Sequence, residues 1–202
     1  RFGGAQRAAL REKNTPSPHI LVMTATPIPR TLAMSLYGDL DLSVIDELPP
    51  GRKPIETLRR TDSGRLKVWG FLKKAIAQGR QAYIVYPLIE ESDSLDYKDL
   101  MDGYASICRD FPRPDYQISI VHGRMKSTDK SLEMDRFVKG ETHIMVATTV
   151  IEVGVDVPNA SVMVIENAEK FGLSQLHQLR GRVGRGSAQS YCILMTGKSL
   201  SD

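Results

Sequence analysis

The stretch Gln175–Arg185 holds the residues best suited to chemistry, and it reads Gln-Leu-His-Gln-Leu-Arg-Gly-Arg-Val-Gly-Arg. If the stretch is helical, with about 100° of turn per residue, Gln178, Arg182 and Arg185 fall within about 60° of one another. The leucines would then form a separate, buried face. One amide and two guanidiniums on one surface indicate an anionic partner. A triphosphate is the obvious candidate, because guanidiniums bind phosphate oxygens at two points.

Such arginines could also stabilise charge on a phosphoryl group during its transfer. A solvated basic face, or one that binds DNA phosphates, explains the same spacing equally well, so both interpretations stay open on the pattern alone. Gly181 and Gly184 each reduce helix stability by roughly 1 kcal/mol. Their presence predicts that a ligand or another backbone approaches closely at this point.

A second stretch, Ala147–Pro158, follows a run that is typical of a buried strand. It therefore lies where a parallel α/β sheet places its ligands, beyond the carboxyl end of a strand. The hydroxyls of Thr148 and Thr149 can bond phosphate, and Asp156 can accept a hydrogen bond from a ribose hydroxyl. A strand-end cap by Thr149 and a turn held by Asp156 are equally compatible with the pattern.

A third stretch, Val121–Met125, also comes directly after a strand-like run. Gly123 permits close approach of a ligand backbone, and Arg124 can meet a phosphate. His122, taken alone, is more often a packed or capping residue than a catalytic one. The hydroxyl-rich stretch Thr24–Arg30 indicates only a turn.

Two features usual in nucleotide-binding proteins are absent from the 202 residues. There is no Gly-x-x-x-x-Gly-Lys-Ser/Thr loop to cradle a triphosphate. There is also no Asp-Glu pair after a strand in the first segment to hold Mg²⁺. Arginines directed at phosphate, without such a cradle, predict half of a bipartite ATP site.

The elements that must position these residues follow a regular alternation. Helical apolar spacing runs from Val68 to a predicted C-cap at Gly79, and it recurs between Ser127 and Gly140. The acid-rich stretch 90–102 reads as a solvated loop that runs into an exposed helix. Strand–helix alternation predicts a parallel sheet with helices on both faces. The predicted strands are 81–86, 117–121, 143–147, 161–165 and 191–195.

Composition places the chain among ordinary globular proteins, with a mildly basic net charge of +3 that permits nucleic-acid binding without demanding it. Two isolated cysteines form no metal or disulfide pattern and fit a reducing cytoplasm. No apolar run is long enough to span a bilayer. The Pro-rich and charged stretch 49–56 predicts a linker between a first domain, 1–48, and a second, 57–202. A surface loop within one domain is the alternative.

Taken together, these elements resemble superfamily 2 helicases, and in particular the RecG family. The stretches 37–55 and 149–160 carry the similarity to RecG. Arg1–Gly3 looks like the residues directly after the family's Walker B box, in motif II. The matching motifs are Thr24–Thr26 for motif III, Gln81–Pro87 for motif IV, Val121–Met125 for the DNA-contact motif that follows, Thr148–Asp156 for motif V and Gln175–Arg185 for motif VI.

The resemblance implies an ATP-dependent DNA helicase that remodels branched DNA, such as forks and Holliday junctions, in recombination and repair. Its motor would have two RecA-like domains, with ATP and Mg²⁺ in the cleft between them and duplex DNA across them. This chain would supply the helicase C-terminal domain and the tail of the first RecA-like domain. ATP and Mg²⁺ would be held mainly by the rest of the first domain, which together with a wedge domain would be its partner in the parent protein.

The resemblance also implies a role for individual residues. They are Arg182, Arg185 and Gln178 at the γ-phosphate; Gly154 and Asp156 at the nucleotide; Thr148, Thr149, Gly123 and Arg124 at the DNA backbone; and Thr24 and Thr26 in coupling ATP to DNA.

Two other functions stay open. The translocase of transcription-repair coupling shares 24–31 and the last two motifs, although 46–54 favours RecG. A non-catalytic DNA-binding module with a RecA-like fold is an alternative of a different class, against which the intact Gln178, Arg182 and Arg185 argue. Because the phosphate loop and the Walker B box are absent, we expect the chain alone to hydrolyse no ATP and to bind DNA weakly, in a salt-sensitive way.

Overall fold

The computed structural model describes residues 50–88, 93–148 and 157–197, with Leu21, Met23, 43–45 and Glu47, and it omits the side chains of 93–98. The chain separates into two compact units, 1–42 and 43–202. All the helices and strands given below belong to the second unit. The predicted turn at Thr24–Arg30 lies outside the described residues, and the domain boundaries inferred from the sequence stay predictions.

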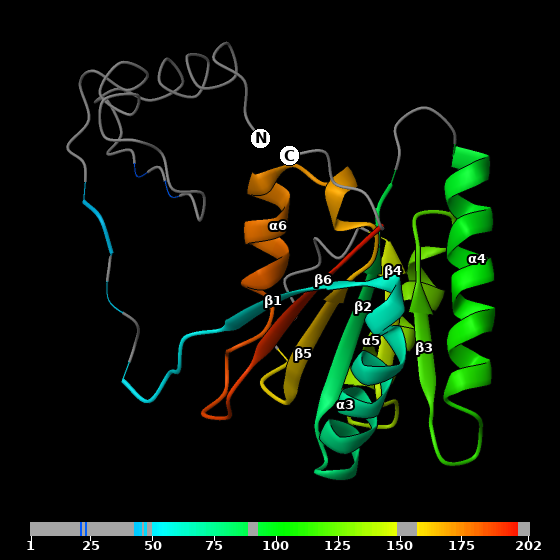
Figure 1. Cartoon of the computed structure of the whole chain (residues 1–202), viewed down its shortest axis with the longest axis horizontal. Coiled ribbons are helices and arrows are strands. Elements are labelled where there is room, and N and C mark those ends of the chain that lie inside the picture. Colours follow the sequence, from blue (N-terminus) through cyan, green and yellow to red (C-terminus); the bar gives the residue numbers. More distant parts are fainter. Residues whose placement is uncertain are drawn as a thin grey trace. The chain divides into compact units, whose positions relative to one another are not determined.

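A six-stranded, all-parallel sheet forms the centre of the second unit, in the order β1-β6-β5-β2-β4-β3 (Figure 1). The predicted parallel sheet is therefore confirmed, and each of the five predicted strands agrees with the structure to within one residue at either end. The strands are β1 Glu56–Thr61, β2 Gln81–Tyr86, β3 Ile118–Val121, β4 Ile144–Thr148, β5 Ala160–Ile165 and β6 Tyr191–Thr196.

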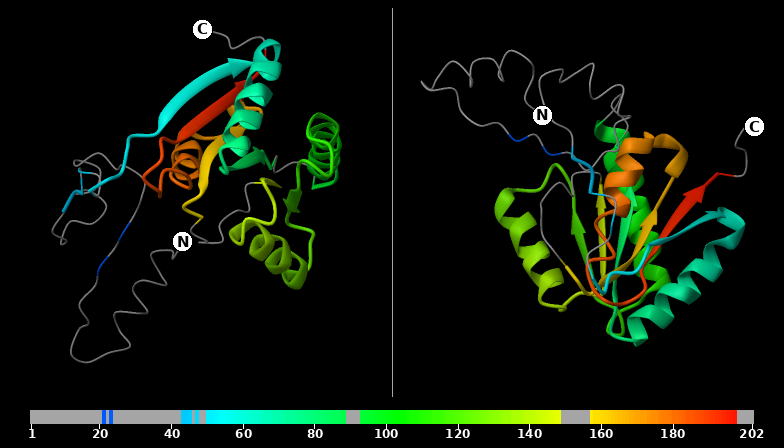
Figure 2. Two further views of the ribbon diagram at one scale, coloured as in Figure 1. Left: turned by 90° about the horizontal axis from the view of Figure 1, so that it is seen from below. Right: turned by 90° about the vertical axis from the view of Figure 1, so that its left-hand side faces the viewer.

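Helices cover both faces of this sheet, as predicted (Figure 2). Side chains of α5 and α6 pack on one face, and those of α3 and α4 pack on the other. Successive residues of a strand point to opposite faces, so Tyr83 and Val85 of β2 join the first cluster, and Ala82 and Ile84 join the second. The helices are α3 Arg65–Ala77, α4 Asp93–Asp110, α5 Ser127–Val138 and α6 Leu173–Arg180, with 3-10 turns η1 Asp62–Gly64 and η2 Ala168–Lys170.

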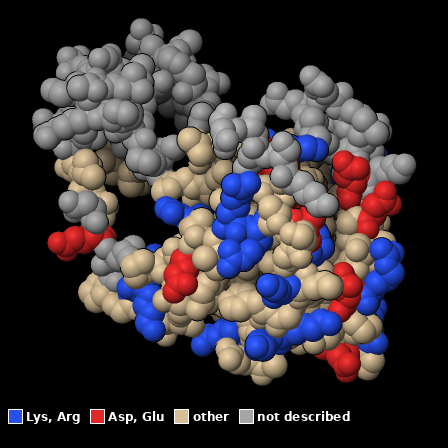
Figure 3. Space-filling view, in the orientation of Figure 1, with Lys and Arg blue, Asp and Glu red and all other residues tan. Residues whose placement is uncertain are grey.

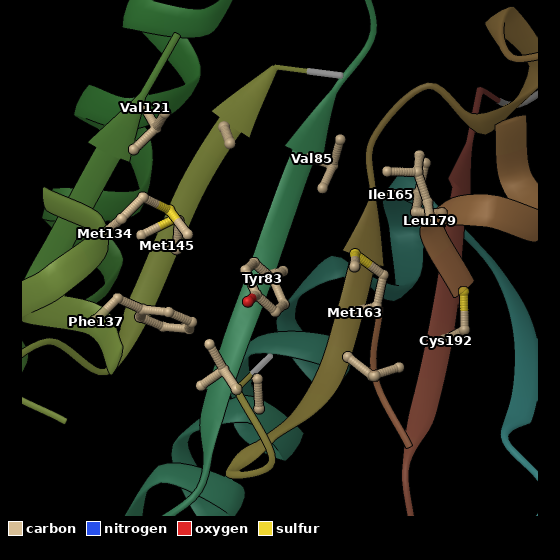
Figure 4. Close-up of a cluster of buried hydrophobic side chains, with 14 of the residues drawn as sticks. Tyr83, Val85, Val121, Met134, Phe137, Met145, Met163, Ile165, Leu179 and Cys192 are labelled. Atoms are coloured by element: carbon tan, nitrogen blue, oxygen red, sulfur yellow. The ribbon is translucent and has the colours of Figure 1, made fainter. Parts of the chain in front are cut away.

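The cluster beneath α5 and α6 determines where α6 lies (Figure 4). Phe137 of α5 and Leu179 of α6 pack with Met145 and Met163 from the central strands, and all four side chains are buried. Burial of each such side chain contributes roughly 1.5–3 kcal/mol. The segment that leads out of α6 is therefore positioned by the core of the domain.

Two elements differ from the sequence-based expectation. Within the described part of the chain, β1 pairs with β6 alone and forms the edge of the sheet. It carries no apolar run in its sequence, because a strand at the edge of a sheet is partly solvated. The acid-rich stretch 90–102 is helical from Asp93 onward, and α4 packs on the core through Leu100 and Ile107. Gly79 and Gly140 have positive φ after α3 and α5, as their predicted C-cap positions require. Within the described ranges, no helix is long and apolar enough to cross a membrane.

Candidate functional site

The predicted DNA-contacting residues that the structure describes lie at the carboxyl ends of two neighbouring strands. Gly123 and Arg124 follow β3, and Thr148 is the last residue of β4. These strands pair directly, so their ends lie roughly 5 Å apart. Gly123 and Arg124 are exposed, and no atom of the described residues lies within 4 Å of the position that a Cβ would take at Gly123. A ligand backbone could therefore approach this edge closely.

The turn between β3 and α5 concentrates positive charge at the same edge. The Lys130 ammonium donates to the carbonyl oxygen of Gly123 at 3.1 Å, and the Met125 N–H donates to the carbonyl of His122 at 3.2 Å. Burial, and then the charges of Lys130 and Arg124, lower the pKa of His122 below its ordinary value. Such a local field favours a phosphate ligand.

Thr148 is buried, and its Oγ1 has no hydrogen-bond partner in the part of the chain that the structure describes. A buried hydroxyl without a partner costs about 1–3 kcal/mol. The residues that follow it, 149–156, lie outside the described ones. The expected roles of Thr149, Gly154 and Asp156 therefore stay predictions, as do those of Thr24 and Thr26.

The helix predicted over Gln175–Arg185 is wrong in its extent. The observed helix, α6, ends at Arg180, before both predicted arginines. Gln178 is exposed on the helix, whereas Arg182 and Arg185 lie half-buried in the turn that follows. The inference that these three side chains share one helical face is therefore incorrect.

Tight packing explains why the chain leaves the helix here. Gly184 has a φ of +79°, which a continuing α-helix cannot accommodate. A Cβ at Gly184 would lie 2.8 Å from Cγ1 of Ile55, and one at Gly186 would lie 2.8 Å from the carbonyl oxygen of Pro158. Val183, directly before Gly184, is buried. A ligand or another backbone was predicted to approach closely at Gly181 and Gly184. The close neighbour of Gly184 is instead a side chain, and a Cβ at Gly181 would make only an ordinary contact, 3.5 Å from the carbonyl oxygen of Gln178. The close backbone approach is at Gly186, which the sequence reasoning did not single out. We call residues 181–186 the arginine turn.

The arginine turn lies at the amino ends of the strands, whereas Gly123, Arg124 and Thr148 lie at the carboxyl ends. Ile55 directly precedes β1 and Pro158 precedes β5, so both close contacts of the turn are with the amino ends of strands. A six-residue strand spans roughly 20 Å. The structure thus forms two groups of candidate residues and separates them by about the length of a strand.

An ion pair near the carboxyl ends of β1 and β5 was missed by the sequence reasoning. The Arg65 guanidinium donates to both carboxylate oxygens of Glu166, at 2.5 Å and 2.9 Å, and to the Asp62 carboxylate at 2.6 Å. The bond to Glu166 is the main cause that raises the pKa of Arg65. Burial, and then the charge of Glu166, raise the pKa of the nearby Tyr86 phenol. Arg65 and Glu166 stand 101 residues apart, so no local pattern links them.

Comparison with known sequences gives a family. Residues 67–187 match the helicase conserved C-terminal domain family. The ATP-dependent DNA helicase RecG of Synechocystis is 55% identical over the whole chain, and RecG of Bacillus subtilis is 52% identical over 96% of it. The chain spans about a quarter of the length of these relatives, 24% and 28%.

Solved structures agree with that family. A structure of RecG bound to a three-way DNA junction matches with a TM-score of 0.70 and 46% identity, over 87% of this chain and 22% of that one. Domain 2 of the DEAD-box helicase Mss116p, bound to an RNA duplex, matches with a TM-score of 0.54 over 72% of this chain and 55% of that one; at 19% identity it shows a likeness of fold alone. The predicted helicase C-terminal fold of the RecA-like type is therefore confirmed. The chain belongs to the helicase conserved C-terminal domain family, and among superfamily 2 helicases it is of the RecG type.

Proposed function

We propose that this chain works as the second motor domain of an ATP-dependent DNA helicase that remodels branched DNA such as forks and Holliday junctions. In this proposal 1–48 completes a preceding RecA-like domain, 49–56 links the two domains, and 57–202 forms the second domain. The observation that carries the proposal is the arginine turn, which presents two guanidiniums from a segment anchored in the core. The identity with RecG proteins over the whole chain supports it.

The arginine turn suits the phosphate end of a nucleotide. Arg182 and Arg185 flank a buried valine and a glycine of fixed conformation, so their backbone positions are held before any ligand arrives. Guanidiniums held in this way bind phosphate oxygens and stabilise charge on a phosphoryl group. The resemblance adds Gln178, from the last turn of α6, to the same proposed site. ATP, when bound, supplies the phosphoanhydride bond whose hydrolysis drives the motor.

The nucleotide contacts expected at Gly154 and Asp156 fit the same location. The chain re-enters the described residues at Val157, and the carbonyl of Pro158 meets the arginine turn at Gly186. Because Asp156 stands two residues before Pro158, this contact supports placing both sets of residues in one nucleotide site.

We assign no Mg²⁺ ligand to this part of the protein. Over the described ranges, no group of three His, Cys, Asp or Glu side chains could hold a metal ion. Following the resemblance, we assign Mg²⁺ and most of the ATP contacts to the rest of the preceding RecA-like domain, and we expect the 202 residues alone to hydrolyse no ATP. A DNA-stimulated ATPase activity of these residues alone, abolished by Arg182→Ala, would contradict this assignment.

The carboxyl ends of β3 and β4 suit the DNA backbone. The exposed Arg124 and the open space at Gly123 stand beside Thr148, and Thr149 would extend the same contact. Nucleotide contacts at the amino ends of the strands and DNA contacts at the carboxyl ends give a physical basis for a motor. A change in the bound nucleotide would bias the position of a domain that also holds DNA, with Thr24 and Thr26 coupling the two events.

DNA-stimulated ATP hydrolysis by the complete helicase tests the proposal. Arg182→Ala and Arg185→Ala should each lower kcat by about 10³-fold or more, while DNA binding stays near the wild-type value. Arg124→Ala should instead weaken DNA binding and leave hydrolysis at saturating DNA largely intact. Arg109→Ala, an exposed arginine of α4, is the matched control and should change neither quantity. Hydrolysis near the wild-type rate in both arginine-turn variants would refute the nucleotide site.

A further inference from the structure

Basic residues are unevenly distributed along the chain. From Arg52 to Arg80 there are nine Lys and Arg and only two acidic residues, a net charge of +7. The whole chain carries +3, so the remaining residues together carry −4. The basic segment contains β1 and α3, and none of the motifs used in the proposed function falls within it.

Three of these basic side chains share one surface. Lys67 and Lys74 are seven residues apart on α3, which places them within about 20° of each other around the helix and about 10 Å apart along it. Arg60 of β1 is in register with Met195, which belongs to the cluster beneath α3, so Arg60 points to the same face of the sheet. Its Cδ lies 3.7 Å from the Cβ position of Gly64, the residue before α3. We call Arg60, Lys67 and Lys74 the basic surface.

No acidic side chain in the described part of the chain pairs with this surface. The ion pairs found there involve Arg65 and Arg136. Arg60, Lys67 and Lys74 are all exposed, and among the described residues the Arg60 guanidinium donates only to the carbonyl of Arg59. Lys and Arg side chains lie over α3, whereas Asp and Glu are more frequent toward α4 (Figure 3). The charge of the basic surface is therefore available to an external anion.

The basic surface is remote from the DNA contact already proposed. β1 and β3 are the two outer strands of the sheet, separated by five strand spacings. At about 4.8 Å per spacing, this amounts to roughly 24 Å. Gly123 and Arg124 follow β3, whereas Arg60 belongs to β1 and Lys67 and Lys74 to the helix after it. The two surfaces therefore cannot bind the same phosphates.

We propose that the basic surface binds the phosphate backbone of duplex DNA as a second contact, in addition to the one at the ends of β3 and β4. This inference rests on the proposed function only for its ligand, DNA, and needs no ATP site. Lysines bind phosphates as point charges, whereas protein interfaces are depleted in lysine and have an apolar centre. Gly70 lies between the two lysines, and no atom of the described residues lies within 4 Å of its Cβ position. The missing side chain therefore lets a DNA strand come close to the helix.

Nucleotide-free binding of a labelled linear DNA duplex between 50 and 200 mM salt, roughly the range over which phosphate contacts lose most of their affinity, tests the inference. Lys67→Ala/Lys74→Ala should weaken binding and make the slope of log K against log salt shallower by about 2, because each lost phosphate contact removes about one unit. Lys67→Arg/Lys74→Arg keeps both charges and should preserve the slope. Arg109→Ala/Lys139→Ala removes two exposed charges elsewhere and is the matched control. Thermal unfolding verifies that each variant folds.

Three outcomes would count against this inference, and they are distinguishable. Wild-type affinity and slope in Lys67→Ala/Lys74→Ala would overturn the second contact and leave the proposed function standing. A wild-type protein that binds no DNA at any salt concentration would overturn both proposals. Poly-glutamate serves as a probe for an acidic protein partner. If Lys67→Ala/Lys74→Ala loses binding to poly-glutamate while its DNA binding is unchanged, the basic surface is assigned to such a partner instead.

Discussion

The guanidinium of Arg65 and the carboxylate of Glu166 form a two-point ion pair that joins the start of α3 to the end of β5. The two side chains are not equally buried: Glu166 is 4% exposed and Arg65 is 33% exposed. Arg65 has a second acceptor in Asp62, whereas the only side-chain partner of the Glu166 carboxylate among the described residues is Arg65. Removal of one partner should therefore have a different effect from removal of the other.

Arg65→Ala should destabilise the domain more than Glu166→Gln does. Loss of Arg65 leaves a buried carboxylate without its partner, which costs about 3 kcal/mol, the lower end of the usual range because Arg65 itself stays partly in water. Glu166→Gln keeps an acceptor and leaves an arginine that still reaches Asp62 and solvent, so the loss should be about 1–2 kcal/mol. Urea unfolding measures both values. Equal losses, or the reverse order, would contradict this view of the pair.

The single tryptophan gives an independent readout of the same pair. The Arg65 guanidinium lies over the Trp69 ring, 5.5 Å from its centroid. Arg65→Ala should therefore shift the tryptophan fluorescence of the folded protein. Lys73 is on the same helix as Trp69, but its ammonium lies over the rings of Phe111 and Tyr116. Lys73→Ala should therefore leave the tryptophan emission unchanged. Identical emission from both variants would mean that Arg65 does not stack on the ring in solution.

Gly184→Ala should destabilise the domain for two separable reasons. The φ of +79° costs a residue with a side chain about 1–2 kcal/mol, and the new Cβ would lie 2.8 Å from Ile55. A second substitution, Ile55→Ala, should relieve the clash but not the backbone cost, so chemical denaturation of the double variant separates the two. Gly70→Ala, on the open face of α3, should instead stabilise the protein by up to about 1 kcal/mol. A Gly184→Ala variant as stable as wild type would contradict the packing of the arginine turn.

The sheet could be predicted where strands are buried on both faces. β4 is buried along its whole length, so apolar composition alone located it. β1 left no such signal, because an edge strand with Arg59 and Arg60 exposed resembles a loop in sequence. The fold class thus followed from local patterns, and the edge strand did not.

The candidate site was only half predictable for a similar reason. Gly123, Arg124 and Thr148 follow buried strands, so the strand direction fixed the edge of the sheet at which they lie. The arginine turn depends on contacts of Gly184 with Ile55 and of Gly186 with Pro158, both from distant parts of the chain. No periodicity in 175–185 carries that information, and a helical face was therefore expected where the chain turns.

Thr148→Val separates a structural role of this residue from a binding role. The Oγ1 is buried without a partner among the described residues, so a methyl group in its place should stabilise the domain by up to about 1 kcal/mol. If the hydroxyl meets a DNA phosphate, the same variant should bind DNA several-fold more weakly. Urea unfolding and nucleotide-free DNA binding measure the two effects. A loss of stability would instead show that the hydroxyl is satisfied within the folded protein.

Lys130→Gln should raise the pKa of His122, because it removes one of the two cations that lower it while keeping a donor for the Gly123 carbonyl. Burial is the larger cause, so the pKa should rise only part of the way to its ordinary value of about 6.5. The sign of the linked stability follows. A lowered folded-state pKa means that the unfolded chain takes up the proton first, so stability falls as pH drops below about 6.5.

In Lys130→Gln that loss of stability at acid pH should be smaller, while above neutral pH the contribution of His122 is the same in both proteins. NMR titration of the His122 ring measures the pKa directly, and Lys139→Ala, an exposed lysine just beyond α5, controls for a general change in charge. Bound DNA should raise the same pKa in the wild-type protein, because a phosphate at this turn would stabilise the imidazolium. A pKa unmoved by DNA would place the backbone contact away from β3 and would remove Arg124 from the proposed site.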